Sequence, residues 1–170
     1  MDLQKISKGE KFPEEVNVVI EIPQNSAVKY EIDKESGALM VDRFLYTSMT
    51  FPFNYGFIPQ TKAKDGDPVD VLVLSSSPVV AGSVIKARPI GMLEMEDEAG
   101  LDNKIIALPT VKIDPFVAHI NDVADLDEAT KAKIKHFFET YKQLEPNKWV
   151  KTKAFLGKKE ALADIEASKE

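Results

Sequence analysis

Short runs of β-prone residues, separated by turn residues, fill the chain from Val16 to about Ile113. Ten prolines and eight glycines, which favour turns, are spread along the chain. No segment repeats at a fixed period, and no stretch is rich enough in Gly, Ser or Pro to be a linker. The pattern predicts a compact antiparallel barrel or sandwich, with strands over 16–22, 28–32, 39–44, 69–74, 84–93 and 104–108.

The hydrophobic period changes after Asp125, where apolar side chains begin to recur at helical spacing. Asp125 and Glu128 are placed as an N-terminal cap and Pro146 as a stop, so we expect one packed helix of about five turns. A shorter terminal helix is expected over 158–168, with little apolar face and a frayed last turn. The apolar face of the long helix consists of Ile134, Phe137, Phe138 and Tyr141.

The composition is that of one folded unit. The chain has 170 residues, of which 44% are hydrophobic, and such a chain buries enough apolar surface to fold without disulfides. We therefore expect a single domain over 1–170, of the α+β class and mainly β. Cysteine is absent, which excludes a disulfide framework, thiolate-bound metals and cysteine nucleophiles. Any metal must be bound by oxygen, or by the two histidines at most.

Charge and hydropathy narrow the possible partners. The net charge of −6 disfavours binding to nucleic acid unless the 22 basic side chains cluster on one surface. The N-terminus has no apolar segment of the signal-peptide kind, and no run approaches the ~18 apolar residues that a membrane span needs. The sequence therefore predicts a cytoplasmic protein that binds neither nucleic acid nor membrane.

The segment 65–70 carries three carboxylates, Asp65, Asp67 and Asp70, in a turn that Gly66 bends and Pro68 keeps out of a helix. Two carboxylates ~4 Å apart repel by roughly 4 kcal/mol at an effective dielectric of ~20, so a converging set must be protonated, solvated or neutralised by a cation. Magnesium fits best, because it takes one or two carboxylates, keeps several waters and accepts phosphate oxygens.

Two other readings of this segment remain open. Aspartates in a polar loop are equally compatible with simple solvation. An EF-hand fits worse, because a loop starting at Asp65 puts Asp70 at the glycine position and Ser76 at the position of the bidentate glutamate.

A second acidic cluster surrounds Ala99-Gly100 between two strand-like runs, which predicts a hairpin with an acidic tip. Alone, such a tip is usually a solvated turn. Beyond the turn, however, Asp102 and Lys104 are two residues apart, so in a strand they share one face and point together into whatever the sheet encloses. That pairing suits a metal-bound phosphate. The acids of the cluster are Glu94, Glu96, Asp97, Glu98 and Asp102.

Cations and aromatic side chains complement these acids. Lys29 and Glu31 share a face of the second predicted strand, and Arg43 is a candidate to bind an anion such as phosphate. Each of these cations, taken alone, is more typical of an ordinary surface residue. The segment 51–59 is rich in aromatic residues and interrupted by Pro and Gly, so we interpret it as a packed loop that presents Tyr55. His119 and His136 are interpreted as structural or surface residues.

Taken together, these motifs resemble those of the bacterial family I soluble inorganic pyrophosphatases. The resemblance runs in order from about Val16 to Val150, and its acidic core is the most specific part. It is carried by Lys29-Tyr30-Glu31, Asp42-Arg43, Pro52-Phe53-Asn54-Tyr55-Gly56, Asp65-Gly66-Asp67-Pro68-Val69-Asp70-Val71, the segment 97–104 and Tyr141-Lys142.

The resemblance implies a five-stranded OB-like antiparallel barrel flanked by one long and one shorter C-terminal helix, assembled as a homohexamer. It also implies hydrolysis of pyrophosphate to two phosphates, with several Mg²⁺ ions in an acid-lined cavity. Asp65, Asp70 and Asp102 would hold the principal ions, with Asp70 bridging, and Asp97 with Asp102 a further ion that arrives with substrate.

The remaining roles are likewise implied by the resemblance. Asp67 would orient or deprotonate the attacking water, which paired metals activate by lowering its pKa. Glu21, Glu31 and Glu98 would act mostly through water. The phosphate oxygens would be held by Lys29, Arg43, Tyr55, Lys104, Tyr141 and Lys142.

Phe51 departs from the family pattern, because many bacterial members have tyrosine there. We expect a modest effect on affinity or rate, since the metal ligands and Asp67 are present. Two alternative functions remain: a metal-dependent hydrolase of another phosphoanhydride, and an OB-fold module that binds oligonucleotides. The second should present exposed aromatic side chains and a basic groove, whereas the signature positions here are acidic.

Overall fold

Five strands close into a ring in the computed structural model, which describes residues 2–169. Their order is β1, β4, β5, β8 and β6, and β6 closes the ring by pairing with β1 from Val16↔Ala87 to Val19↔Val84. The predicted five-stranded barrel is therefore confirmed, although β5 and β8 run parallel. The strands are β1 (Val16–Ile22), β4 (Asn54–Ile58), β5 (Val69–Val73), β6 (Val84–Asp97) and β8 (Lys104–Pro109).

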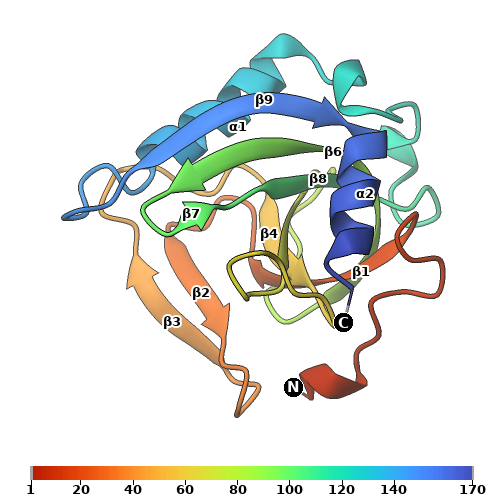
Figure 1. The fold of residues 1–170 in the computed structure, drawn as a ribbon, viewed down its shortest axis with the longest axis horizontal. Helices are drawn as coiled ribbons and strands as arrows, with labels where there is room; N and C mark the ends of the chain where they lie inside the picture. Colours follow the sequence, from red (N-terminus) through yellow and green to blue (C-terminus); the bar gives the residue numbers. More distant parts are fainter. Residues whose placement is uncertain (1, 170) are drawn as a thin grey trace.

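Strand β6 continues past its pairing with β1 and pairs further along with β7 (Gly100–Leu101) and β9 (Val150–Gly157). The β6–β7 pair is the predicted acidic hairpin. β2 (Val28–Ile32) and β3 (Leu39–Phe44) form a separate two-stranded sheet that stands beside the barrel (Figure 1). The β2–β3 hairpin forms one wall of the cavity described below.

Strand β4 corrects the prediction of an irregular loop over 51–59. Pro52 and Pro59 lie outside the strand, so neither removes a hydrogen bond from its ladder. Gly56 has a packing role: a Cβ built there would lie 1.9 Å from the carbonyl oxygen of Val19. The glycine therefore permits the close approach of β1 and β4. Strand β9 was also missed, because its side chains are exposed or only partly buried and no run of buried apolar residues marks it.

Helix α1 (Glu128–Thr140) has 13 residues, which is shorter than the expected five turns. Its N-cap is Asp127, whose carboxylate accepts from the Thr130 N–H at 2.7 Å. The predicted cap, Asp125, instead belongs to the short 3₁₀ helix η3 (Val123–Asp125), where it completes a capping box with Asp122. The helix ends before Tyr141, and the chain turns through Asn147, at a φ of 59°, to reach β9.

Helix α2 (Lys158–Ala167) is held more firmly than expected. Ala161 and Ile165 are completely buried, and the Ser168 carbonyl accepts from the Lys62 N–H at 2.6 Å. The expected fraying of the last turn is therefore wrong. Two apolar positions suffice here, because the barrel supplies the rest of the contact surface.

Successive residues of the barrel strands point to opposite sides of the sheet, and both sides are buried. Leu72 of β5 and Ile106 of β8 pack with Phe137 of α1, whereas Val71 and Ile105 pack on the opposite face with Ile165 of α2. The N-terminal 3₁₀ helix η1 (Leu3–Lys5) covers a third, smaller cluster, and η2 (Pro115–Val117) follows β8. Within residues 2–169, no helix is long and apolar enough to cross a membrane.

Phe137→Ala tests the packing of α1 on the barrel. Phe137 is 1% exposed and touches Phe51, Phe138 and Tyr141 through its ring, so we expect a loss of about 3–5 kcal/mol in the free energy of unfolding. Urea unfolding followed by circular dichroism measures it. Phe116→Ala, the same change at a side chain 78% exposed, is the control and should change stability little.

Candidate active site

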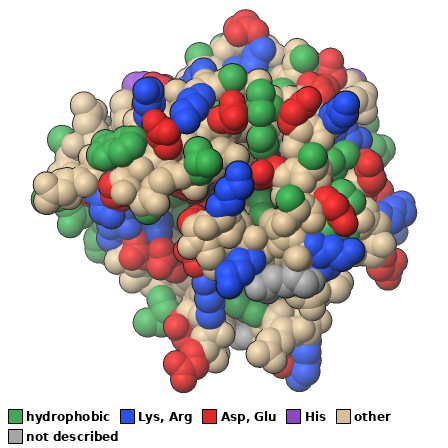
Figure 2. Space-filling view, in the orientation of Figure 1, with side chains coloured by type: hydrophobic (Ala, Val, Ile, Leu, Met, Phe, Trp, Pro, Cys, Tyr) green, Lys and Arg blue, Asp and Glu red, His purple; other side chains and the backbone are tan. Residues whose placement is uncertain are grey.

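One cavity of about 850 Å³ lies between the β2–β3 hairpin, the barrel and the segment that follows α1. Acidic and basic side chains lie interspersed over the face of the molecule in Figure 2, without a large patch of one sign. Each side chain predicted for the site lines the cavity. These side chains come from the barrel strands, the β2–β3 hairpin, the turns before β5 and β8, and the segment that follows α1. They are Glu21, Lys29, Glu31, Arg43, Tyr55, Asp65, Asp67, Asp70, Asp97, Glu98, Asp102, Lys104, Tyr141 and Lys142.

Lys104 is a buried ammonium at the centre of this set, only 4% exposed. Its Nζ lies 2.6 Å from Asp70 Oδ2 and also contacts Asp102 Oδ1. The parallel register Val71↔Ile105 brings Asp70 alongside Lys104, and the two-residue spacing puts Asp102 on the same side. Burial alone lowers the pKa of Lys104, but the charges of Asp70 and Asp102 outweigh it and raise the pKa well above its ordinary value.

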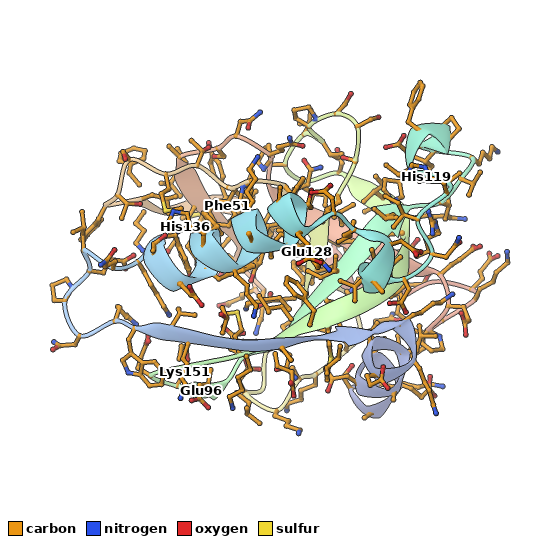
Figure 3. The ribbon with its side chains drawn as sticks, turned by 90° about the horizontal axis from the view of Figure 1, so that it is seen from above. Phe51, Glu96, His119, Glu128, His136 and Lys151 are labelled. Carbon is orange, nitrogen blue, oxygen red and sulfur yellow. The ribbon has the colours of Figure 1, made fainter. Side chains whose placement is uncertain are left out.

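Two tyrosines lie against this lysine. Lys104 Nζ is 5.7 Å from the Tyr55 ring centroid, and Tyr141 stacks on Phe137 at 4.9 Å and 16°. Burial raises the pKa of Tyr141 to about 12 and that of Tyr55 well above its usual value. Both phenols therefore keep their protons at neutral pH and can donate hydrogen bonds. Phe51 lies beneath α1 (Figure 3), with its ring 5.7 Å from Tyr55 and 6.2 Å from Tyr141.

Asp65 and Asp67 occupy the turn between β4 and β5, with exposed side chains. Gly66 has a φ of +93°, which a residue with a side chain rarely adopts. The Asp65 carboxylate accepts from the Asp67 N–H at 3.0 Å, so the two acids are oriented by the turn itself. Asp67 Oδ1 lies 2.6 Å from Lys34 Nζ, which reaches across from the β2–β3 turn. Such an exposed pair contributes less than about 1 kcal/mol.

The cations of the β2–β3 hairpin are held by carboxylates. Lys29 contacts Glu31 and lies 3.3 Å from Asp42. Arg43 contacts Asp42, and its Nε lies 2.9 Å from the buried carboxylate of Glu145. Although burial opposes it, the charges of Glu145 and Asp42 raise the pKa of Arg43 further.

Lys142 connects the segment after α1 to the β6–β7 hairpin. It is 6% exposed, and its Nζ lies 2.9 Å from Asp97 and 3.3 Å from Glu98. Lys148 lies 2.7 Å from the other oxygen of Glu98. Partial burial raises the pKa of Glu98, but the hydrogen bond from Lys148 and the charge of Lys142 outweigh it and lower the pKa to about 2.

Two acids of the site are disfavoured as anions. Burial raises the pKa of Glu21 to about 7, although its carboxylate accepts from the Ile32 N–H at 2.7 Å. Burial likewise raises the pKa of Asp102, despite the contact with Lys104. Both groups would gain from a further cation in the cavity, which favours their charged forms.

The donor set fits a hard divalent cation. Its groups are carboxylates on several walls, with room for the waters that magnesium retains. Within residues 2–169, no three His, Cys, Asp or Glu residues are close enough together to enclose an ion by themselves. Lys104 occupies the position between Asp70 and Asp102. His119 and His136 are exposed and do not line the cavity, as predicted (Figure 3).

The sequence did not single out several partners in the site. Lys34 pairs with Asp67, and Glu145 pairs with Arg43. Each partner lies far away in the sequence, in a charged segment of the kind that is usually exposed. Lys148 also escaped notice. Asp42 was visible only as part of a motif. Periodicity carries no signal for such pairs, because each joins separate elements.

Comparison with known proteins agrees with this geometry. A family model described as inorganic pyrophosphatase matches residues 18–170. The inorganic pyrophosphatase of Gluconobacter oxydans is 61% identical over 161 residues, which are 95% of this chain and 93% of the relative. The Helicobacter pylori pyrophosphatase structure has a TM-score of 0.92 and 55% identity, covering 96% of this chain and 95% of its own.

The Thermus thermophilus pyrophosphatase structure is similar to the same extent. Its TM-score is 0.95 at 45% identity, and the match covers 99% of this chain and 97% of that chain. The match therefore spans the barrel, both helices and the β2–β3 hairpin. The chain belongs to the inorganic pyrophosphatase family, and the resemblance predicted from its motifs is confirmed.

Proposed function

We propose that this protein hydrolyses inorganic pyrophosphate to two phosphates and uses Mg²⁺ as its cofactor. The observation that carries the proposal is one cavity in which buried lysines and carboxylates alternate around Lys104, in a chain of the inorganic pyrophosphatase family. Such a cavity suits a small, highly charged anion that enters with metal ions. It lacks the basic groove with stacking aromatics that suits single-stranded nucleic acid.

The carboxylates of the cavity would hold the ions. Asp65, Asp70 and Asp102 are the proposed ligands of the principal ions, with Asp70 shared, and Asp97 joins Asp102 for an ion that comes with substrate. Bound magnesium supplies a water of lowered pKa and offsets the charge of the phosphates. Glu21, Glu31 and Glu98 act through water.

The cations of the cavity bind the phosphate oxygens. Arg43 and Lys142 are held beside carboxylates, so they are charged and oriented before substrate arrives. Tyr55 and Tyr141 donate hydrogen bonds, because burial keeps their phenols protonated. Binding would therefore replace internal ion pairs: the cations would contact the phosphates, and the carboxylates would be left to hold the metal. Lys29 and Lys104 complete the proposed set.

Asp67 is the proposed base that orients or deprotonates the attacking water. Its carboxylate is exposed to the cavity and points toward Lys34. It makes no contact with the buried ion pairs around Lys104, and its own partner, Lys34, is an exposed side chain, so water can reach the carboxylate.

Substrate comparison tests the proposal. Phosphate release should be rapid with pyrophosphate and Mg²⁺, absent with EDTA, and far slower with ATP. Comparable turnover of ATP would instead favour a general phosphoanhydride hydrolase. Binding of single-stranded DNA without any hydrolysis would favour an OB-fold binding module.

The assembly is part of the proposal as well. We propose a single domain over 1–170 that forms a homohexamer. Large apolar side chains of β3 support an assembly, because Val41 and Phe44 are each more than half exposed. Light scattering coupled to size exclusion measures the number of subunits, and a monomer would contradict the hexamer.

Asp67→Asn tests the proposed base. The change keeps the size of the side chain but removes its basicity, so we expect kcat to fall by about 100-fold or more at saturating Mg²⁺. Steady-state phosphate release is the measurement. Asp2→Asn, the same change in the N-terminal segment outside the cavity, should leave kcat unaltered. Undiminished turnover in Asp67→Asn would remove Asp67 from this role.

The raised pKa of Glu21 should make the stability of the metal-free protein depend on pH. Its pKa is raised from 4.5 to about 7, so the folded state holds this proton more tightly than the unfolded state. The resulting stabilisation is complete below pH 4.5 and is lost as the pH rises through about 7. Glu21→Gln, which resembles the protonated form, should reduce this decline. Urea unfolding in EDTA at several pH values measures it, and an unaltered pH profile in the variant would contradict the assignment.

A further inference from the structure

Thr61 stands at the base of the turn that carries Asp65 and Asp67. It is only 3% exposed. Its hydroxyl donates to the Ile58 carbonyl at 2.6 Å and accepts from the Val69 N–H at 3.0 Å. One side chain therefore joins the end of β4 to the start of β5, on the two sides of the turn.

The end of α2 braces the same turn. The Lys62 N–H donates to the Ser168 carbonyl at 2.6 Å, and Thr61 forms a β-bridge with Lys169. Ser168 is itself buried, and its hydroxyl bonds to the Ile165 carbonyl at 2.7 Å. The turn is thus attached to a helix whose Ile165 is completely buried against the barrel.

Inside the turn, hydrogen bonds pass this anchoring on to the acids. The Ala63 N–H donates to the Asp67 carbonyl at 2.7 Å, and the Gly66 N–H donates to the Ala63 carbonyl at 3.0 Å. The side chains of Asp65 and Asp67 are exposed, so the protein locates them through the backbone of the turn and not through packing.

We propose that Thr61, with the end of α2, is a positioning residue that places Asp65 and Asp67 for metal binding and for the attack on pyrophosphate. The inference rests on the proposed function of those two aspartates. Threonine suits the task because its branched Cβ restricts χ1 and keeps the hydroxyl aimed at both strand ends. Valine has the same shape but leaves the Ile58 carbonyl and the Val69 N–H without this partner.

The test compares Thr61→Val with Thr61→Ser, which keeps the hydroxyl. The first measurement is amide hydrogen exchange in the metal-free protein. In Thr61→Val, the amides of Ala63 and Val69 should exchange about 10-fold faster or more, while that of Ile106 in β8 stays slow. In Thr61→Ser, protection should be largely restored.

The second measurement is Mg²⁺ binding by calorimetry without substrate, followed by steady-state kinetics. Thr61→Val should bind Mg²⁺ more weakly and lose about 10- to 100-fold in kcat, with a smaller change in KM, because the aspartates act on the reacting water. Thr61→Ser should lie close to the wild type. A lower melting temperature with unchanged exchange in the turn and unchanged Mg²⁺ binding would reduce Thr61 to a purely structural role and overturn the inference.

A truncation after Ala167 provides a second route, which also decides the matter if Thr61→Val does not fold. It removes the acceptor of the Lys62 N–H while Thr61 stays in place. Faster exchange over 62–67 and weaker Mg²⁺ binding are expected, and no change in either would overturn the inference. Failure of the proposed function would appear separately, as a wild type that binds Mg²⁺ but does not hydrolyse pyrophosphate.

Discussion

The buried ammonium of Lys104 is the interaction on which the site depends. A charge with so little exposure is costly to desolvate, and it is tolerated only because Asp70 and Asp102 contact it from two directions. That arrangement needs the parallel neighbours β5 and β8, because their register puts Asp70 beside Lys104. The fold and the charge pattern therefore support each other. The barrel brings Asp70, Asp102 and Lys104 together, and the ammonium of Lys104 holds the two carboxylates close to one point.

The same logic extends over the whole cavity. Lys29, Arg43 and Lys142 each lie against carboxylates, so the charged groups neutralise one another. A cavity lined by charges of one sign would be subject to strong self-repulsion. Alternating pairs avoid that repulsion and keep each group in place.

Strand β1 of the barrel and both strands of the β2–β3 hairpin were predictable, because period-two alternation and turn residues mark 16–22, 28–32 and 39–44 with the bounds that the structure has. The aspartates of the cavity were found through the spacing of their motifs. Sequence reasoning failed where a residue's role depends on a distant contact. Gly56 reads as an interruption until β1 is seen against it, and α2 seems weakly amphipathic until the barrel covers Ile165. Glu145 and Lys34 find their partners across separate elements, which periodicity does not encode.

Strand β6 belongs to two parts of the sheet at once. Ala87 lies between Val16 of β1 and Pro109 of β8, while Met92, further along, lies between Ile105 of β8 and Leu156 of β9. The closed ring and the outer extension therefore share one backbone, and detaching β6 from either leaves the other with an open edge (Figure 1). From this topology we expect cooperative unfolding, in which the wall that carries Asp97 and the ring that carries Asp70 are lost together.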